Sequence, residues 1–195
     1  MRLTDQILEF AKTRSEGTPL TAKRLLHLGS RAAVDQALSR LARRGHLIRA
    51  ERGVYLLPVG GRFGSRPPAA DKVANAVAEQ EGQHVTESGA AAANALGLTN
   101  QVPVRAVFLT SGRPHELRLG KQLVELKPAP GWQLGRNRAG RIVRALHWLG
   151  RERINEAASV LQGKLTPDER RELSTAPTSG MPGWLAKPVA ELAHG

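Results

Sequence analysis

The sequence predicts an α+β protein made of two domains. Apolar residues recur at helical spacing near both ends of the chain, whereas short runs rich in branched and aromatic residues lie at 46–57 and 104–126. A stretch dense in glycine and proline begins at Pro58. We therefore expect a first domain at residues 1–58, a linker at 59–70 and a second domain at 71–195.

The segment from Ser30 to Gly45 has the features of a complete amphipathic helix. Ser30 is a favoured N-cap residue, and Gly45 permits the left-handed conformation that often ends a helix. The apolar stripe at i, i+3, i+4 and i+7 consists of Val34, Ala37, Leu38 and Leu41. The opposite face is polar and carries several arginines. We expect one side of this helix to be buried and the other to present cations and short polar groups.

The elements around this helix predict a winged helix-turn-helix. A helical pattern runs from Leu3 to Arg14, and Thr21 is a suitable cap for a shorter second helix before the tight turn into the Ser30 helix. After it, two strand-like runs at 46–50 and 54–57 flank a turn. Two helices, a tight turn, an amphipathic helix and a hairpin follow the order of this fold. An ordinary solvated helix followed by a structural flap is the simpler interpretation.

The polar face of the Ser30 helix predicts contacts with DNA. Arginine and glutamine match the hydrogen-bonding edges of guanine and adenine in the major groove, and cations match phosphates. The residues that we expect to face bases are Arg31, Asp35, Gln36 and Arg40. Those that we expect to contact phosphates from the helix, the hairpin and the linker are Ser30, Ser39, Arg43, Arg49, Arg52, Arg62 and Arg66.

The charge distribution indicates a polyanionic partner. The chain carries a formal net charge of +12, and residues 1–70 hold 13 of the 29 Lys and Arg residues against 5 of the 17 acids. The first third of the chain therefore holds a net +8. No basic amphipathic helix has an aromatic face, so nucleic acid is favoured over a membrane. We expect double-stranded DNA as the partner and no membrane association.

Residues 71–195 predict a mixed α/β domain with a small sheet and several helices. The expected helices lie at 71–81, 88–96, 138–161, 166–173 and 184–193. The expected strands lie at 104–110, 115–119 and 122–126, the last two paired around Gly120. One side of the long helix carries a candidate basic stripe of Arg138, Arg141, Arg144 and Arg151.

The composition excludes several classes of function. The chain has no cysteine, which excludes disulfide frameworks, thiol catalysis and cysteine-based metal sites. Its N-terminus lacks a secretory pattern, and no apolar run approaches the roughly 20 residues of a membrane span, so we expect a soluble, cytoplasmic protein. The six histidines show no metal-ligand spacing. With no phosphate-binding loop or nucleophile motif, we expect no enzyme, no cofactor and no metal.

Two stretches resemble a known family: GSRAAVDQALSRLARRGHLIRAERGVYLLP and VPVRAVFLTSGRPHELRLGKQLVELKPAP. They are similar to AbiEi-type antitoxins, the transcriptional regulators of bacterial type IV (abortive infection) toxin–antitoxin operons, and the resemblance covers residues 1–150. It implies a repressor whose winged helix binds inverted repeats in operator DNA and autoregulates the operon. It also implies a C-terminal antitoxin domain that neutralises a nucleotidyltransferase-like toxin, with or without direct contact.

Two alternatives of other classes remain open. Glu125-Leu126-Lys127 matches half of a nuclease site, in which carboxylates hold a divalent metal and a lysine assists the attacking water. Such a site needs another acid on a neighbouring strand, where Glu116 is the candidate; alternating charge on a solvated strand gives the same pattern. The other alternative is a protein-interaction module with a degenerate winged helix, which would bind no DNA specifically.

Overall fold

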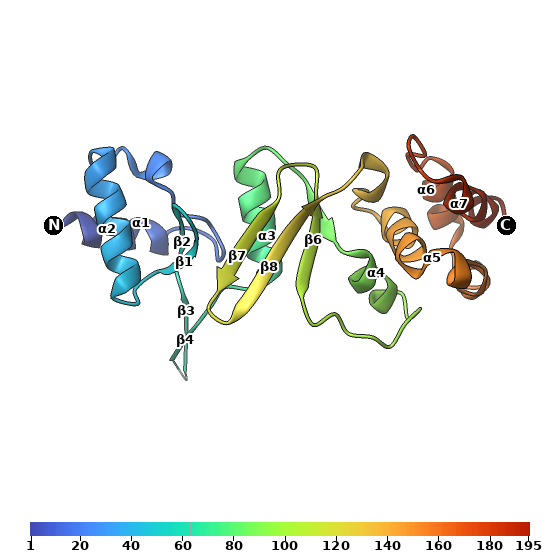
Figure 1. Cartoon of the computed structure of the whole chain (residues 1–195), viewed down its shortest axis with the longest axis horizontal. Coiled ribbons are helices and arrows are strands. Elements are labelled where there is room, and N and C mark those ends of the chain that lie inside the picture. The colour runs from blue at the N-terminus through green and yellow to red at the C-terminus, as the bar shows by residue number, and fades with distance from the viewer. Residues whose placement is uncertain (63) are drawn as a thin grey trace. The chain divides into compact units, whose positions relative to one another are not determined.

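The computed structural model describes residues 1–62 and 64–195, and its fold is α+β with small sheets, as the sequence predicts (Figure 1). The chain forms two compact units. The first comprises residues 1–83 and 115–125, and the second comprises residues 84–114 and 126–195. The predicted linker at 59–70 lies within the first unit, and its residue Phe63 lies outside the described residues.

Three helical segments open the first unit: α1 (Leu3–Lys12), the 3-10 helix η1 (Ala22–Leu25) and α2 (Arg31–Arg43). The Ser30 hydroxyl accepts a hydrogen bond from the Ala33 N–H at 3.4 Å, and Gly45 has a φ of 78°. Both predicted ends of α2 are therefore confirmed. The expected Thr21 cap is wrong, because this side chain makes no capping hydrogen bond to η1.

The apolar stripe of α2 is buried as predicted. Leu38 and Val34 have no exposed surface, and Ala37 and Leu41 are at most 4 % exposed. These side chains form one hydrophobic core with Ile7 of α1 and with residues of η1 and the hairpin that follows. This core holds α2 in place and leaves its polar face in solvent.

The predicted hairpin follows α2 as β1 (Ile48–Glu51) and β2 (Val54–Leu56). The backbone of Leu20, between α1 and η1, also pairs with Tyr55 of β2 through two hydrogen bonds of 2.8 and 3.0 Å. The hairpin is thus tied to the segment between the first two helices. The sequence does not predict this third strand-like contact, because it involves a single residue.

A second hairpin occupies part of the predicted linker. β3 (Val59–Gly61) and β4 (Gly64–Arg66) pair antiparallel, and in Figure 1 they extend away from the helices of the first unit. Backbone groups make this pairing, so a glycine-rich segment forms it without a side-chain pattern that would predict a strand. The predicted helix follows as α3 (Ala70–Gln80).

Glu16 joins the loop after α1 to the start of α3. Its carboxylate accepts hydrogen bonds from Lys72 Nζ at 2.5 Å, from the Ala69 N–H at 3.0 Å and from Arg66 Nη1 at 3.1 Å. These partners, Lys72 foremost, lower the pKa of Glu16 from 4.5 to about 2. The loop and the helix are therefore held together by a carboxylate that stays ionised in moderately acidic solution.

We expect Glu16→Gln to change how stability depends on pH. A carboxylate whose pKa falls on folding stabilises the native state above its unfolded pKa, and this stabilisation is lost as the pH falls through the folded pKa. The wild type should melt at a higher temperature than Glu16→Gln at neutral pH, and the difference should shrink between pH 4.5 and about 2. Thermal melts over this range measure the effect, with Glu9→Gln on exposed α1 surface as the control. A difference that is constant with pH would contradict this role.

A four-stranded sheet has the order β5-β6-β8-β7. Its strands are β5 (Val85–Glu87), β6 (Ala106–Thr110), β7 (His115–Leu119) and β8 (Gln122–Pro128). The three predicted strands are therefore confirmed within a few residues. Along β7, buried and exposed side chains alternate, with Leu117 and Leu119 buried.

The helices of the second unit are α4 (Gly89–Ala95), the 3-10 helix η2 (Gly131–Gln133), α5 (Arg138–Gln162), α6 (Pro167–Ser174) and α7 (Gly183–His194). Gly150, with a φ of 75°, interrupts α5. Thr166 and Glu169 form the predicted start of α6, because each accepts a hydrogen bond from the backbone N–H of the other. Apolar side chains of α4, α5, α6 and α7 share one core.

Candidate nucleic-acid interface

The solvent face of α2 brings most of the predicted base-contacting residues together. An open groove of about 480 Å³ is lined by Asp35, Gln36, Ser39, Arg40 and Arg43. Helical periodicity places these residues on one side, opposite the buried stripe, so their side chains share a surface. The groove combines an amide, a hydroxyl, one carboxylate and two guanidinium groups. It is therefore a polar, donor-rich surface on a rigid helix.

Arg31 lies in the first turn of α2 beside this groove. Its Nε is 3.8 Å from a carboxylate oxygen of Asp35, and the two side chains are 77 % and 51 % exposed. Such an exposed pair contributes about 0–1 kcal/mol and is easily exchanged for another partner. Arg31 is thus free to reorient toward a ligand. Asp35, which is a candidate for base contact, also serves as the ion-pair partner of Arg31.

The hairpin β1–β2 places the two predicted phosphate-contacting arginines in solvent. Arg49 on β1 and Arg52 in the turn are both exposed, and neither pairs with a carboxylate of the described residues. Gly53, in the turn, has a φ of 78°, which a glycine adopts without strain. The turn therefore offers two cations on a short, well-defined loop.

His115 contacts this hairpin through Glu51, a role that the sequence does not predict. The side chain is 3 % exposed; its Nδ1 lies 3.1 Å from Glu51 Oε1 and its Nε2 lies 3.3 Å from Glu81 Oε2. Both contacts are hydrogen bonds when both ring nitrogens carry a proton. His115 on β7 thus links the end of β1 to the end of α3. No local pattern predicts this, since the three residues are far apart in the sequence.

Two other predicted residues lie on the second hairpin. Arg66 is engaged within the protein, because its Nη1 donates to Glu16 and to the Pro67 carbonyl oxygen at 2.9 Å. Arg62, in the turn after β3, is exposed. The guanidinium of Arg62 is therefore available to a phosphate. Arg66 would first have to break its hydrogen bond to Glu16.

The predicted basic stripe of α5 is not a continuous exposed surface, which corrects the sequence analysis. Arg144 is buried; its Nη1 donates to the carbonyl oxygens of Gln133 and Gly135, and its Nη2 donates to Glu87 at 3.0 Å. Arg141 binds the same carboxylate through two hydrogen bonds of 2.7 and 3.1 Å. Burial raises the pKa of Glu87, but the two arginines outweigh burial and hold this pKa below its ordinary value.

The remaining arginines of that stripe also have partners inside the second unit. Arg138 pairs with Glu169 of α6, and the Arg151 guanidinium lies 5.8 Å from the ring centre of Trp184. The sequence alone does not show whether these arginines are paired or exposed to solvent, because their partners are distant in the chain. The stripe therefore serves the packing of the second unit.

Comparison with known proteins assigns the chain to a family without assigning a function. The profile of DUF6088, a family of unknown function, matches residues 6–172. The chain belongs to the DUF6088 family. No curated protein and no solved structure matches the sequence. The match spans both compact units of this DUF6088 protein, so the family comprises both of them and not the α2 module alone.

The strand with the candidate nuclease motif is β8 of this DUF6088 protein, on which Glu125 is partly buried and Lys127 is exposed. Glu125 and Lys127 alternate along β8 with the buried residues Val124 and Leu126, and Glu116 of β7 pairs with Arg118 at 3.7 Å. Among the described residues, no three His, Asp or Glu side chains are grouped so as to hold a metal ion. Over the same residues, every helix is too short or too polar to cross a membrane.

Proposed function

We propose that the protein is a sequence-specific DNA-binding repressor that autoregulates its operon and acts as the antitoxin of a nucleotidyltransferase-like toxin. The observation that carries the DNA-binding part is the open groove on α2, where Gln36, Ser39, Arg40 and Arg43 converge. A helix that enters the major groove needs such a row of donors, acceptors and cations, together with an apolar back that anchors it.

The surrounding elements support the assignment of a winged helix-turn-helix. α1, η1 and α2 share one core, and the β1–β2 hairpin follows α2 directly. The isolated β-bridge between Leu20 and Tyr55 joins a third backbone segment to that hairpin. In this proposal α2 is the recognition helix and the hairpin is the wing, with Arg52 at its tip.

The pairing of charges also supports the proposal. In the second unit, Arg138, Arg141 and Arg144 bind carboxylates of the same unit. In the first unit, Arg40, Arg43, Arg49 and Arg52 have no carboxylate partner among the described residues, so they keep their charge for a polyanion. The elements that the proposal places against DNA therefore carry several cations without a carboxylate partner among the described residues.

We expect Arg49→Ala and Arg52→Ala to weaken binding to operator and to random DNA alike. Cations that contact phosphates contribute through counterion release, so each lost contact should lower the salt dependence by roughly one unit of slope. Titrations of both duplexes at several salt concentrations measure this slope. Arg171→Ala, an exposed arginine of α6, is the matched control. Loss of discrimination at one base position, with an unchanged salt slope, would instead show that the wing reads sequence.

The antitoxin part of the proposal rests on the resemblance to AbiEi-type antitoxins, and co-expression tests it. Cells that express a nucleotidyltransferase-like toxin encoded beside this chain should grow when the chain is co-expressed. The Arg31→Ala variant, altered on the α2 face, should still restore growth if neutralisation belongs to the C-terminal domain. Failure of the wild type to restore growth would reject the antitoxin role and leave the repressor role to be decided by DNA binding.

A further inference from the structure

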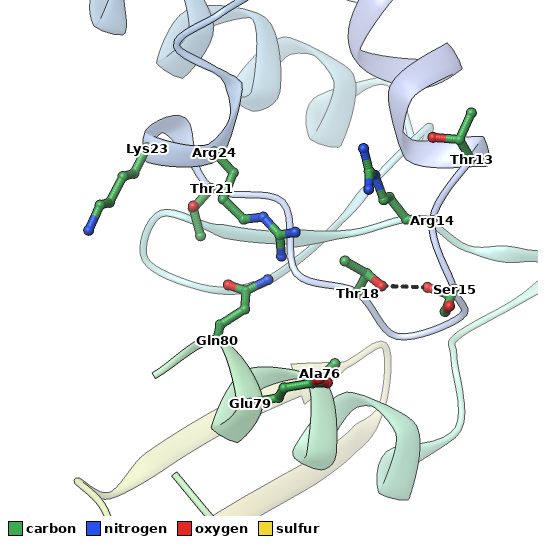
Figure 2. Close-up of a pocket in the computed structure, with 10 residues that line it drawn as sticks. All are labelled: Thr13, Arg14, Ser15, Thr18, Thr21, Lys23, Arg24, Ala76, Glu79 and Gln80. Atoms are coloured by element: carbon green, nitrogen blue, oxygen red, sulfur yellow. Dashed lines mark hydrogen bonds between the residues drawn. The ribbon is translucent and has the colours of Figure 1, made fainter. Parts of the chain in front are cut away.

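A second basic concavity lies within the first unit, away from the polar face of α2. It has a volume of about 690 Å³ and is formed by residues between the end of α1 and η1 together with the last turns of α3 (Figure 2). No residue of α2 or of the β1–β2 hairpin is among those that line it. This basin is therefore separate from the surface that we propose for base reading.

Three cations line the basin, and they are not neutralised within the protein. Arg14, Lys23 and Arg24 form no ion pair with a carboxylate of the described residues. Arg14 lies over the ring of Phe10, 4.3 Å from its centre. Glu79 is the acid among the described lining residues. By contrast, Lys72 and Arg66 of the same unit are both bound by Glu16. The basin thus has an excess of positive charge.

The wall that carries these cations is held by specific contacts. Gln80 of α3 donates to the Pro19 carbonyl oxygen at 2.9 Å, and the Thr18 hydroxyl donates to the Ser15 carbonyl oxygen at 2.7 Å. Gly17 has a φ of 86° and sits so close to α3 that an added Cβ would lie 2.8 Å from the Lys72 backbone. The loop is therefore fastened to α3, so the basin exists before any ligand arrives.

The chemistry of the lining selects phosphate groups. Guanidinium groups bind phosphate oxygens through paired hydrogen bonds, and an ammonium adds a point charge. The hydroxyls of Ser15 and Thr21 add further donors, since those of Thr13 and Thr18 already donate to backbone carbonyl oxygens. In Figure 2 the guanidinium of Arg24 lies between Thr18 and Gln80, Arg14 lies on the α1 side, and the side chain of Lys23 points away from the other labelled residues. No aromatic side chain is among the described residues that line the basin, so this lining recognises the charged end of a ligand and not a stacked base.

We propose that this basin binds a small molecule carrying two or more phosphate groups, of the pyrophosphate or nucleoside diphosphate class. Its volume lies within the range of small-molecule sites, about 300–1,000 Å³. More than one phosphate is needed to satisfy three separate cations. The inference does not depend on the proposed repressor function, since the basin shares no residue with the α2 groove.

Calorimetric titration of the full chain with pyrophosphate tests the proposal. We expect saturable binding that Arg24→Gln and Arg14→Gln each weaken about tenfold or more, since each variant removes a charge-assisted hydrogen bond to phosphate. Arg43→Gln on α2 removes the same charge from the same unit and should change affinity less than about twofold. Glu79→Gln should tighten binding. Melting curves show whether each variant is folded.

The other outcomes each overturn the proposal. Absence of binding at millimolar pyrophosphate would reject the site, and equal weakening by Arg43→Gln and Arg24→Gln would show general electrostatic attraction. A random duplex titrated against the same variants distinguishes the source of the phosphate. If Arg14→Gln and Arg24→Gln weaken duplex binding as strongly as Arg43→Gln does, while pyrophosphate does not bind, the basin serves the DNA backbone instead.

Discussion

Replacing Arg144 with methionine is expected to destabilise the second unit by about 3–5 kcal/mol, the usual cost of removing one partner from a buried ion pair. Arg144 is 2 % exposed, and its guanidinium binds two backbone carbonyl oxygens besides Glu87. Methionine would leave these carbonyl oxygens without a donor and would leave Glu87 to Arg141 alone.

Tryptophan fluorescence during urea unfolding measures this effect selectively. Trp132, Trp148 and Trp184 are the three tryptophans of the chain, and all lie in the second unit. Arg171→Met is the matched control, because Arg171 is 79 % exposed and pairs with the exposed Asp168. It should shift the transition by less than about 1 kcal/mol. Equal shifts for the two variants would show that the buried guanidinium has no special role in stability.

Replacing Leu38 with alanine is expected to destabilise the first unit by about 2–5 kcal/mol and to weaken all DNA binding together. Leu38 has no exposed surface and belongs to the core that joins α1, η1, α2 and the hairpin. Truncation leaves a cavity under α2, and the loosened helix can no longer present its polar face in one arrangement.

Amide hydrogen exchange in α1 and α2 reports on this unit, since the unit contains no tryptophan. Leu26→Ala is the control, because it makes the same chemical change at a side chain that is 48 % exposed. It should change stability by about 0.5 kcal/mol or less. If Leu38→Ala lost operator binding while random-duplex binding and exchange in α2 stayed unchanged, Leu38 would act in recognition and not in support of the helix.

The features that the sequence predicts correctly are local. The Ser30 cap, the buried stripe around Leu38 and the left-handed Gly45 all belong to one short segment, so helical periodicity and capping preferences determine them. The same holds for the start of α6 at Thr166. The groove on α2 could be predicted for the same reason, because residues on one face of a helix are neighbours whatever the rest of the chain does.

The features that sequence reasoning missed depend on distant residues or on backbone pairing alone. From the sequence, Arg144 is expected to be an exposed cation. In the structure it is bound by Glu87 of β5. His115 shows no motif, yet the fold places Glu51 and Glu81 at its two ring nitrogens. The β3–β4 hairpin has no apolar alternation, because backbone hydrogen bonds form it. Such contacts appear only when tertiary structure brings the partners together.

The central claim is that α2 reads a DNA sequence, and competition binding tests it most directly. Operator DNA is taken from upstream of the gene, and a scrambled duplex competes with it for binding to each protein. The proteins are the wild type, Arg31→Ala, Gln36→Ala and the control Arg171→Ala, and a melting curve is recorded for each. The account predicts that Arg31→Ala and Gln36→Ala each cost about 1–3 kcal/mol on the operator, far less on the scrambled duplex, and leave the melting temperature unchanged. If both folded variants kept the full operator preference of the wild type, α2 would not be the reading helix.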